Sequence, residues 1–344
     1  MKSELSCFIR YNLSFINLID TFKFLYKRVK KYINKKFNIK YYPENYQHLL
    51  DNDFIITPKQ NIENYIPNEL TNDLELKLSS QTIKLNKLDE ILCVGNSDQT
   101  KFHDIEDYES LHRFIWSRYY ASDITDSKDI ENVQALIDYW CHSFCLKSKQ
   151  LSHNLITHPY TMSERMTNII WFHIINKKIM STETDYMMHS TAKNIINNLE
   201  FYHDGFGNHL INNIRSVLIY GLYFNNEKII KNFSGMLDEY VNKFIISGFT
   251  KDYSSHYQLL FYYWLNDILK LSIHYNKRLL ISILNKHLKE LKEKTLFFYN
   301  ISSNTFDLVG DLSPDYPVGY LLTSLDENYI YDEKYSVQHL YKQL

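Results

Sequence analysis

Two short polar stretches hold side chains that could carry out proton transfer. The first contains Asn208 and His209, and the second contains His256 and Tyr257. An amide and an imidazole can donate hydrogen bonds to an oxyanion while charge develops on it. A phenol can take up a proton and return it, provided that its pKa is lowered. These residue types predict removal of a proton next to a carboxylate, a reaction that requires no metal and no cofactor.

A tyrosine base needs a nearby cation, because the ordinary pKa of a phenol is about 10. The sequence offers His209, His256 and Arg165 as candidates for that cation. Each catalytic candidate also has a structural alternative. Asn208 could cap a helix, His209 could be a hydrogen-bonded structural residue, and Tyr257 could belong to the apolar stripe that follows it.

Other polar residues could bind a substrate. Tyr160 and Arg165 could hold a carboxylate or cap a helix, and both interpretations stay open. Asp311 and Asp315 lie in the polar loop 310–317, where they could bind hydroxyl groups, shape the loop or form a pair of glycosidase carboxylates. The candidate substrate-binding residues are Tyr160, Arg165, His256 and Asp311.

The elements that must position these residues are helices. Apolar residues recur at steps of three and four, most clearly between 254 and 274. Thr161 and Glu164 have the spacing of a capping box, and Gly248 stands where a left-handed C-terminal cap would be expected. The predicted helices are 105–121, 127–147, 161–178, 182–202, 207–224, 227–247, 254–274 and 277–299.

Short links between eight long helices predict antiparallel hairpins and an all-α fold. Such hairpins can stack into an open superhelix or close into a toroid. Residues 41–100 contain helix-breaking prolines and predict an irregular arm, in which Thr82–Leu85 could be extended. We therefore divide the chain into N-terminal helices and arm (1–100), a helical domain (101–325) and a C-terminal tail (326–344).

Composition limits the possible functions. The 344 residues are 44% hydrophobic with a net charge of −2, which allows a sizeable core and gives no basic field for nucleic acid. Neither a membrane span nor a secretory signal is evident, which predicts a cytoplasmic protein, with the periplasm or secretion as the alternative. Cys141 and Cys145 supply two metal ligands at best. The basic run 27–36 predicts a solvated helix face or a contact with an anionic surface.

Five short motifs follow one another between about residues 105 and 320. They are Phe114–Tyr120, His158-Pro159-Tyr160 with Arg165 and Asn168, Asn208-His209 with Asn212, Ser254-Ser255-His256-Tyr257, and Gly310-Asp311 with Ser313-Pro314-Asp315. Their order resembles the N-terminal helical domain of the heparinase II/III-like polysaccharide lyases, a group that includes alginate-lyase relatives.

The resemblance implies an (α/α) toroid, complete or incomplete, with a long cleft for an acidic polysaccharide rich in uronic acid. It implies β-elimination, in which Asn208 and His209 neutralise the sugar carboxylate and Tyr257 acts as base and then as acid. A β-sandwich domain normally follows in that family. This chain ends at Leu344, so we expect a truncated product, a half to which a separate chain supplies that domain, or a binding remnant. Gln258 stands where relatives have a histidine after the tyrosine.

Two other functions are compatible with the residues. One is a non-catalytic glycan-binding or polysaccharide-assembly protein that retains the cleft and lacks the sandwich domain. The other is a helical scaffold for protein partners. A basic cleft around Arg165 and His209 would favour a glycan ligand, whereas a conspicuous exposed apolar groove would favour protein partners.

Overall fold

The computed structural model describes most of the chain from residue 70 onward. The described residues are 70, 73–91, 102, 104–120, 126–147, 155–201, 207–300, 303 and 305–325. All of them except Phe201 belong to one compact unit that comprises 49–200 and 206–344. The predicted basic run 27–36, the tail 326–344 and most of the predicted N-terminal segment 1–100 lie outside the described residues.

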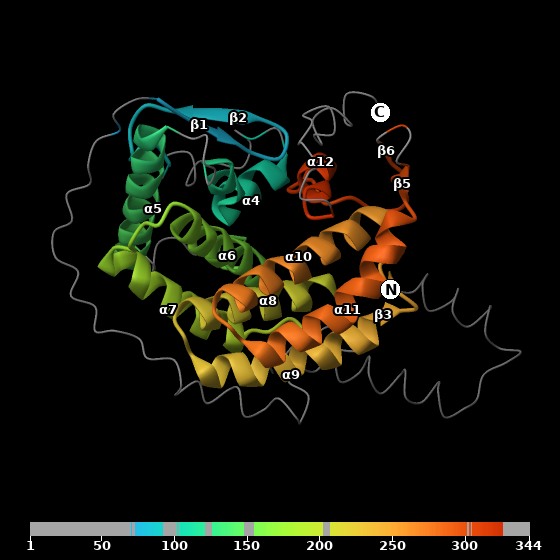
Figure 1. Cartoon of the computed structure of the whole chain (residues 1–344). Helices are drawn as coiled ribbons and strands as arrows, with labels where there is room; N and C mark the ends of the chain where they lie inside the picture. Colours follow the sequence, from blue (N-terminus) through green and yellow to red (C-terminus); the bar gives the residue numbers. More distant parts are fainter. Residues whose placement is uncertain are drawn as a thin grey trace, which may run out of the picture. The chain divides into compact units, whose positions relative to one another are not determined.

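Helices dominate the described residues, so the all-α prediction is confirmed (Figure 1). They are α4 (Ile105–Arg113), the 3₁₀ helix η3 (Ile115–Tyr120), α5 (Ser127–Lys147), α6 (Pro159–Ile175), α7 (Thr182–Asn197), α8 (Asn208–Tyr223), α9 (Glu227–Phe244), α10 (Ser255–His274), α11 (Arg278–Leu296) and α12 (Val318–Leu322). Three antiparallel hairpins join β1 (Leu74–Lys77) to β2 (Thr82–Leu85), β3 (Ile245–Ile246) to β4 (Phe249–Thr250), and β5 (Tyr299–Asn300) to β6 (Thr305–Phe306). The predicted extended segment 82–85 is therefore β2.

Helices α6, α8 and α10 form an inner layer. Every residue of α6 from Tyr160 to His173 is buried, and so is every residue of α8 from Leu210 to Leu222. Helices α7, α9 and α11 bury one face each and form an outer layer, as expected for amphipathic helices. Helix α8 packs between α6 and α10 (Figure 1).

The inner helices begin at the same end of their layer. Helices α6 and α8 are parallel, because Asn212 donates to the carbonyl oxygen of Tyr160 and, farther along both helices, Arg215 pairs with Glu164. Helix α9 runs back, so that the hydroxyl of Tyr240 near its end donates to the carbonyl oxygen of residue 207, just before α8. The next inner helix, α10, therefore starts where α6 and α8 start.

The beginning of α6 differs from the prediction. The helix starts at Pro159, and Nδ1 of His158 accepts the N–H of Tyr160 at 3.3 Å as the N-terminal cap. Proline suits the first helical position because its fixed φ matches the helix and it has no N–H to leave unpaired. The predicted capping box of Thr161 and Glu164 is wrong, since both residues lie inside the helix and are buried.

Two further helix ends also differ from the prediction. The predicted helix 105–121 is interrupted at Phe114, which has a φ of 58°. The predicted helix 227–247 ends at residue 244, and Ser247 and Gly248 form the turn between β3 and β4 with positive φ angles of 50° and 79°. Gly248 is left-handed as predicted, but it belongs to a two-residue hairpin turn rather than a helix cap.

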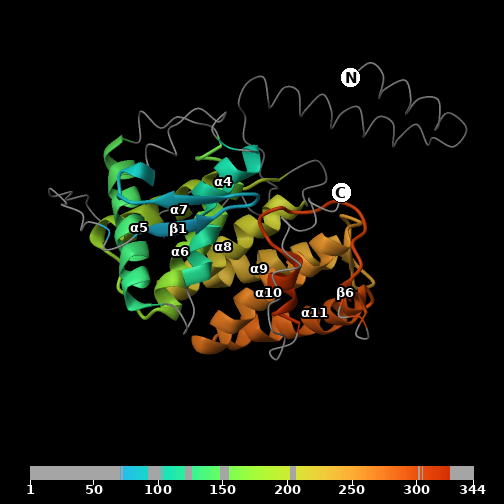
Figure 2. The same ribbon diagram turned by 90° about the horizontal axis from the view of Figure 1, so that it is seen from above.

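The remaining elements cover the inner layer. The β1–β2 hairpin packs against α5 and η3 (Figure 2). The polar loop predicted over 310–317 belongs to a segment without helix or strand, 307–317, which leads into α12, and α12 packs on α10. Within the described ranges, no helix combines the length and apolar character that crossing a bilayer requires.

Candidate functional site

Polar side chains gather where the three inner helices begin. Helix α6 starts at Pro159, α8 at Asn208 and α10 at Ser255. Each helix N-terminus carries roughly half a positive charge, so three of them together favour an anion. We call this group of residues the helix-start cluster, and it consists of His158, Tyr160, Glu200, Asn208, His209, Asp252, Tyr257 and Asp311.

Two histidines share one carboxylate on the α6–α8 side of the cluster. Nδ1 of His209 lies 2.9 Å from Oε1 of Glu200, and Nε2 of His158 lies 3.5 Å from the same oxygen. The ring centroid of Tyr160 is 4.7 Å from that of His209. The side chain of Glu200 is 5% exposed, whereas those of His158 and His209 are 39% and 37% exposed. The group therefore has a buried acidic centre and an accessible face.

Glu200 is held in place from behind by Asn213. Its Oε2 accepts from Nδ2 of Asn213 at 3.2 Å, and its backbone N–H donates to Oδ1 of Asn213 at 3.0 Å. Asn213 is fully buried and also donates to the hydroxyl of Ser163. These contacts fix the position of the Glu200 carboxylate before any ligand binds. A hydrogen bond from Nδ1 of His209 to this carboxylate also sets the tautomer of the His209 ring.

Carboxylates dominate the α10 side of the cluster. Burial raises the pKa of Tyr257 above its ordinary value, and the charges of Asp311 and Asp252 raise it further. Burial and the charge of Asp311 raise the pKa of Asp252 to about 6, while His209 acts to lower it. These mutual effects place the four residues in one electrostatic neighbourhood. The phenol of Tyr257 is neutral at pH 7 in this setting and is a proton donor.

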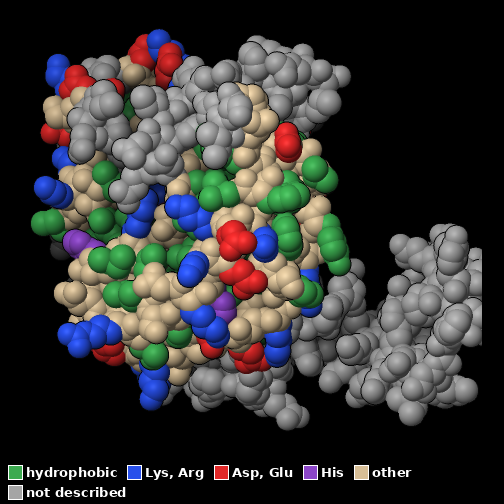
Figure 3. Space-filling model, turned by 45° about the vertical axis from the view of Figure 1, so that its right-hand side comes forward, with side chains coloured by type: hydrophobic (Ala, Val, Ile, Leu, Met, Phe, Trp, Pro, Cys, Tyr) green, Lys and Arg blue, Asp and Glu red, His purple; other side chains and the backbone are tan. Residues whose placement is uncertain are grey.

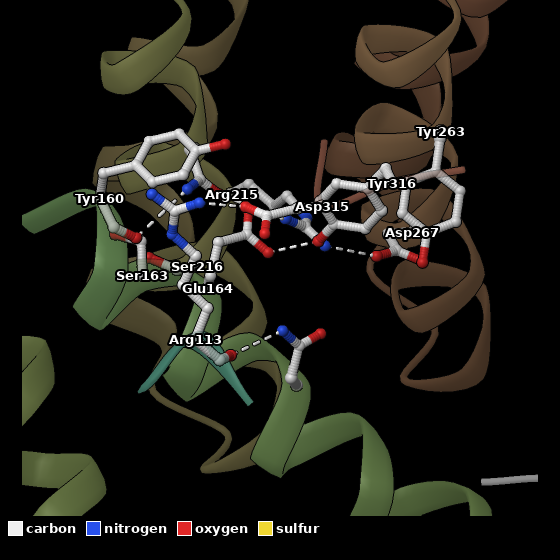
Figure 4. Close-up of polar contacts among 12 residues, drawn as sticks. Arg113, Tyr160, Ser163, Glu164, Arg215, Ser216, Tyr263, Asp267, Asp315 and Tyr316 are labelled. Atoms are coloured by element: carbon white, nitrogen blue, oxygen red, sulfur yellow. Dashed lines mark hydrogen bonds and ion pairs between the residues drawn. The ribbon is translucent and has the colours of Figure 1, made fainter. Parts of the chain in front are cut away.

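Arg113 lies beneath Tyr160. Its guanidinium is 5.1 Å from the centre of the Tyr160 ring (Figure 4). It pairs with Glu106 at 2.9 Å. It also pairs with Asp315, whose carboxylate accepts from the hydroxyl of Ser79 at 3.0 Å. Arg113 therefore connects the end of α4 to the loop that precedes α12.

A buried network of charges crosses the middle of the inner layer. Arg215 lies 3.1 Å from Glu164 and 2.8 Å from Asp267, and Arg118 reaches Asp267 at 3.0 Å. The hydroxyl of Tyr316 donates to Glu164 (Figure 4). Burial acts to raise the pKa of Asp267, but the two guanidinium groups outweigh it and hold that pKa below its ordinary value. We call these five residues the interior network.

Arg165, a predicted substrate-binding residue, lies away from the cluster. Its guanidinium donates to the carbonyl oxygens of His112 and Ile156 at 3.0 and 3.2 Å and lies 4.6 Å from the ring of Trp140. Burial lowers the pKa of Arg165 to about 10. Because α6 directs this side chain into the protein, where it is buried, Arg165 offers no exposed guanidinium to a ligand and supplies no basic cleft.

His256, another predicted substrate-binding residue, belongs to a latch that ties loop 307–316 to α10. The hydroxyls of Ser254 and Ser255 donate to carbonyl oxygens of the loop at 2.6 and 2.7 Å. Nε2 of His256 donates to the carbonyl oxygen of Tyr316 at 2.9 Å, and Nδ1 accepts a backbone N–H of the loop at 3.3 Å. Burial lowers the pKa of His256 to about 4, so the ring is neutral and structural.

Gly310 allows this loop to lie close against α10. Its φ is +83°, and a Cβ at this position would lie 2.7 Å from the carbonyl oxygen of Tyr253. A side chain would therefore push the loop outward. The close approach brings Asp311, the residue after it, to the helix-start cluster.

An apolar pocket of about 440 Å³ lies beside the start of α10. It is lined mainly by Ile246, Phe249, Tyr253, Gln258, Phe298 and Val309. The side chain of Tyr253 is 86% exposed, and Ile246 and Val309 are also exposed. Figure 3 brings this side of the molecule forward and shows hydrophobic side chains gathered there. This is the kind of surface that the sequence analysis associated with a protein partner.

The structure adds three residues that the sequence analysis gave no role. His158 lies in a quoted motif, and Glu200 and Asp252 come from the links that lead into α8 and α10. The signal that could have found the two carboxylates is their position, because each precedes the start of an inner helix. Asn208, the first residue of α8, is half-buried and directly precedes His209 at the start of the helix.

Comparisons of the chain with protein-family models, with curated proteins and with solved structures found no match.

Proposed function

We propose that the chain is a polysaccharide lyase-like protein that acts by β-elimination on an anionic polysaccharide containing uronic acid. The observation that carries the proposal is the convergence of three helix N-termini that bear Tyr160, Asn208, His209 and Tyr257. A uronate carboxylate at this place would face the positive ends of all three helices. The motif order that resembles the heparinase II/III-like family supports the same reaction.

Asn208 and His209 neutralise the sugar carboxylate in this scheme. Removal of the neighbouring proton breaks a C–H bond, and its electron pair delocalises onto the carboxylate oxygens. The side-chain amide of Asn208 and the ring of His209 donate hydrogen bonds as this charge grows, which lowers the barrier. The electron pair then forms a carbon–carbon double bond and expels the glycosidic oxygen.

Tyr257 moves the protons in this scheme. Its neutral phenol suits the second half of the reaction, in which the leaving oxygen receives a proton. The first half requires a phenolate, which the neighbouring Asp252 and Asp311 oppose. Burial opposes the phenolate most, so neutralising these carboxylates lowers the pKa of Tyr257 only in part, and the base role also needs a nearby cation.

The fold proposal follows the same resemblance. Successive hairpins with α6, α8 and α10 inside and α7, α9 and α11 outside support an (α/α) toroid, complete or incomplete. A β-sandwich domain on a separate chain would close one side of the site. The apolar pocket beside α10 offers a surface for a protein partner.

A second candidate function is glycan binding or polysaccharide assembly without catalysis. Two observations favour it. The carboxylates around Tyr257 oppose formation of the phenolate. Gln258, which stands at the family's histidine position, is buried and used structurally, since its amide binds the backbone of Gly248 and Thr250 at 2.8 Å each.

Ultraviolet absorbance distinguishes the two functions, because elimination creates a conjugated, absorbing sugar at the new chain end. The purified full-length chain is mixed with a panel of uronic acid polysaccharides. We expect a rising signal with one of them. Tyr257→Phe should abolish the signal without changing the fold, whereas the exposed Tyr253→Phe, the matched control, should leave it intact.

Asn208→Ala tests the charge-neutralising role. We expect turnover to fall by about 100-fold or more with a smaller loss of glycan binding, because the amide acts mainly as charge develops. Equal losses of binding and turnover would make Asn208 a ground-state contact. A flat absorbance trace with retained binding to one polymer would replace the lyase proposal by the glycan-binding one.

A further inference from the structure

We propose that His158, Glu200 and His209 bind one divalent transition-metal ion, with Zn²⁺ the best fit. The three side chains each offer a ligand atom, and these atoms all lie within 4.8 Å of one another. Two imidazole nitrogens and one carboxylate oxygen form a common protein site for Zn²⁺ with an open position. The chemistry of the donor set disfavours Mg²⁺ and Ca²⁺, which prefer oxygen ligands.

The spacing suits a tetrahedral ion. Metal–ligand bonds of 2.0–2.2 Å at the tetrahedral angle separate neighbouring ligand atoms by about 3.3–3.6 Å. Oε1 of Glu200 lies 3.5 Å from Nε2 of His158, which is inside that range, and 2.9 Å from Nδ1 of His209, which is shorter than it. Side-chain rotations that move the ligand atoms by about an ångström complete the geometry.

The surroundings are those of a built site. Glu200 is buried and held at both its carboxylate and its backbone N–H by the amide of Asn213. This is the arrangement by which outer residues orient a metal ligand. The two histidines are more than a third exposed, so an ion can enter and keep a position open for water or a ligand oxygen.

Metal binding competes with one hydrogen bond. Nδ1 of His158 accepts the N–H of Tyr160 at the start of α6. Ligation through Nε2 would place a proton on Nδ1 and end this bond. The bond is long at 3.3 Å, and losing a helix cap costs little compared with the free energy that bound zinc contributes.

A bound ion would also give His209 the hydrogen-bond donor that the elimination needs, and this step rests on the proposed function. Neutral His209 that donates from Nδ1 to Glu200 has an acceptor at Nε2, whereas neutralising a sugar carboxylate requires a donor. A metal on Nδ1 keeps the proton on Nε2. The positive ion would also offset the charges of Glu200, Asp252 and Asp311, which otherwise repel an anionic sugar.

Calorimetric titration of the chelator-treated full-length chain with Zn²⁺ tests the proposal, with Mg²⁺ as the comparison. We expect one Zn²⁺ site that is weakened about 100-fold or more in His209→Ala and Glu200→Gln. His158→Asn should have the same effect while keeping a good helix cap. The matched control is His287→Ala, because His287 pairs with Asp238 at 2.8 Å and should leave the site unchanged.

X-ray absorption at the zinc edge provides a measurement on the unaltered protein, so the test survives if a variant fails to fold. We expect nitrogen and oxygen ligands at about 2.0–2.2 Å. Sulfur at about 2.3 Å would assign the ion to cysteines and overturn the proposal. Equal Zn²⁺ affinity in all variants, or no binding by the wild type, would overturn it too. Zinc binding without elimination would leave the metal site standing and remove the lyase. Elimination by a wild-type chain that binds no Zn²⁺ would leave the lyase standing and overturn the metal site.

Discussion

Helix α8 carries two polar regions that use the same kinds of side chain in opposite ways. In the interior network, Arg215 is fully buried between Glu164 and Asp267. Less than two turns earlier, His209 is 37% exposed and lies among Glu200, Asp252 and Asp311. Charges balance in the first region, whereas negative charge is in excess in the second.

The interior network has the features of a region that stabilises the fold, whereas the helix-start cluster has those of a functional site. Opposite charges in the interior network join α6, α8 and α10, and removing one partner would leave another charge buried and uncompensated. The helix-start cluster makes fewer buried contacts, and its excess carboxylates raise the pKa values of Tyr257 and Asp252. Shifted pKa values at an accessible place are typical of a functional site. Four substitutions test this division through the free energy of unfolding.

Arg215→Met should have the largest effect. It leaves the carboxylates of Glu164 and Asp267 without their shared guanidinium, so we expect a loss of about 3–5 kcal/mol. Urea unfolding measures the loss. Arg278→Ala, at the exposed first residue of α11, is the control and should change stability by less than about 0.5 kcal/mol. A loss below about 1 kcal/mol in Arg215→Met would show that the network does not hold the inner layer together.

His256→Asn should come second, with a loss on the order of 2–3 kcal/mol at pH 7.5, because two buried hydrogen bonds of the latch are disrupted. The folded-state pKa of His256 is about 4, below the unfolded value near 6.5. Its contribution to stability is therefore present above pH 6.5 and is lost as the pH falls toward 4.

Unfolding midpoints measured between pH 7.5 and 4.5 check this pH dependence. Wild-type stability should fall across that interval more steeply than the stability of His256→Asn. Parallel curves for the two proteins would mean that His256 is not the group that titrates.

Asp252→Asn should stabilise the protein. The folded-state pKa of Asp252 is about 6, above the ordinary value of 3.8, so its charged form is disfavoured by folding. That penalty is absent below about pH 3, grows between pH 3.8 and 6, and is fully present above pH 6. We expect a gain on the order of 1–2 kcal/mol at pH 8 and none at about pH 3, measured by thermal unfolding of chelator-treated protein. A loss of stability at pH 8 would show that the charge is compensated.

His209→Ala should have the smallest effect on stability, below about 1 kcal/mol, because the side chain is partly exposed. In contrast, we expect it to abolish glycan turnover. Calorimetric unfolding and the absorbance assay on the same sample give both values. A large loss of stability would place His209 with the interior network.

The sequence predicted the helices better than their ends. Spans such as α5 and α8 follow from long apolar periodicities, and the structure places them within a residue of the prediction. Ends depend on local chemistry that periodicity does not capture. His158 caps α6 where a box at Thr161 was expected, and the hairpin turn at Gly248 ends α9 early.

The sequence located only those residues of the candidate site that stand at the start of a helix. Asn208, His209 and Tyr257 stand at helix starts, which the motifs located. Arg165, in contrast, lies inside α6, beyond its first turn. A motif does not tell which face of a helix a side chain occupies, so the sequence could not show that Arg165 is buried. Glu200 belongs to no motif, and its role emerges from its distance to two histidines.

The contacts of loop 307–316 have a consequence for synthesis of the chain. The hydroxyl of Ser79 meets Asp315 across 236 positions, and Tyr316 reaches back to Glu164. A nascent chain that has emerged as far as α11 holds all three helix starts, but it contains neither Asp311 nor the loop that the latch binds. Because contacts of such long separation form late, translation must pass residue 316 before the site can close. The helix-start cluster, which needs Asp311, and the interior network, which needs Tyr316, are therefore both completed only after this loop is synthesised.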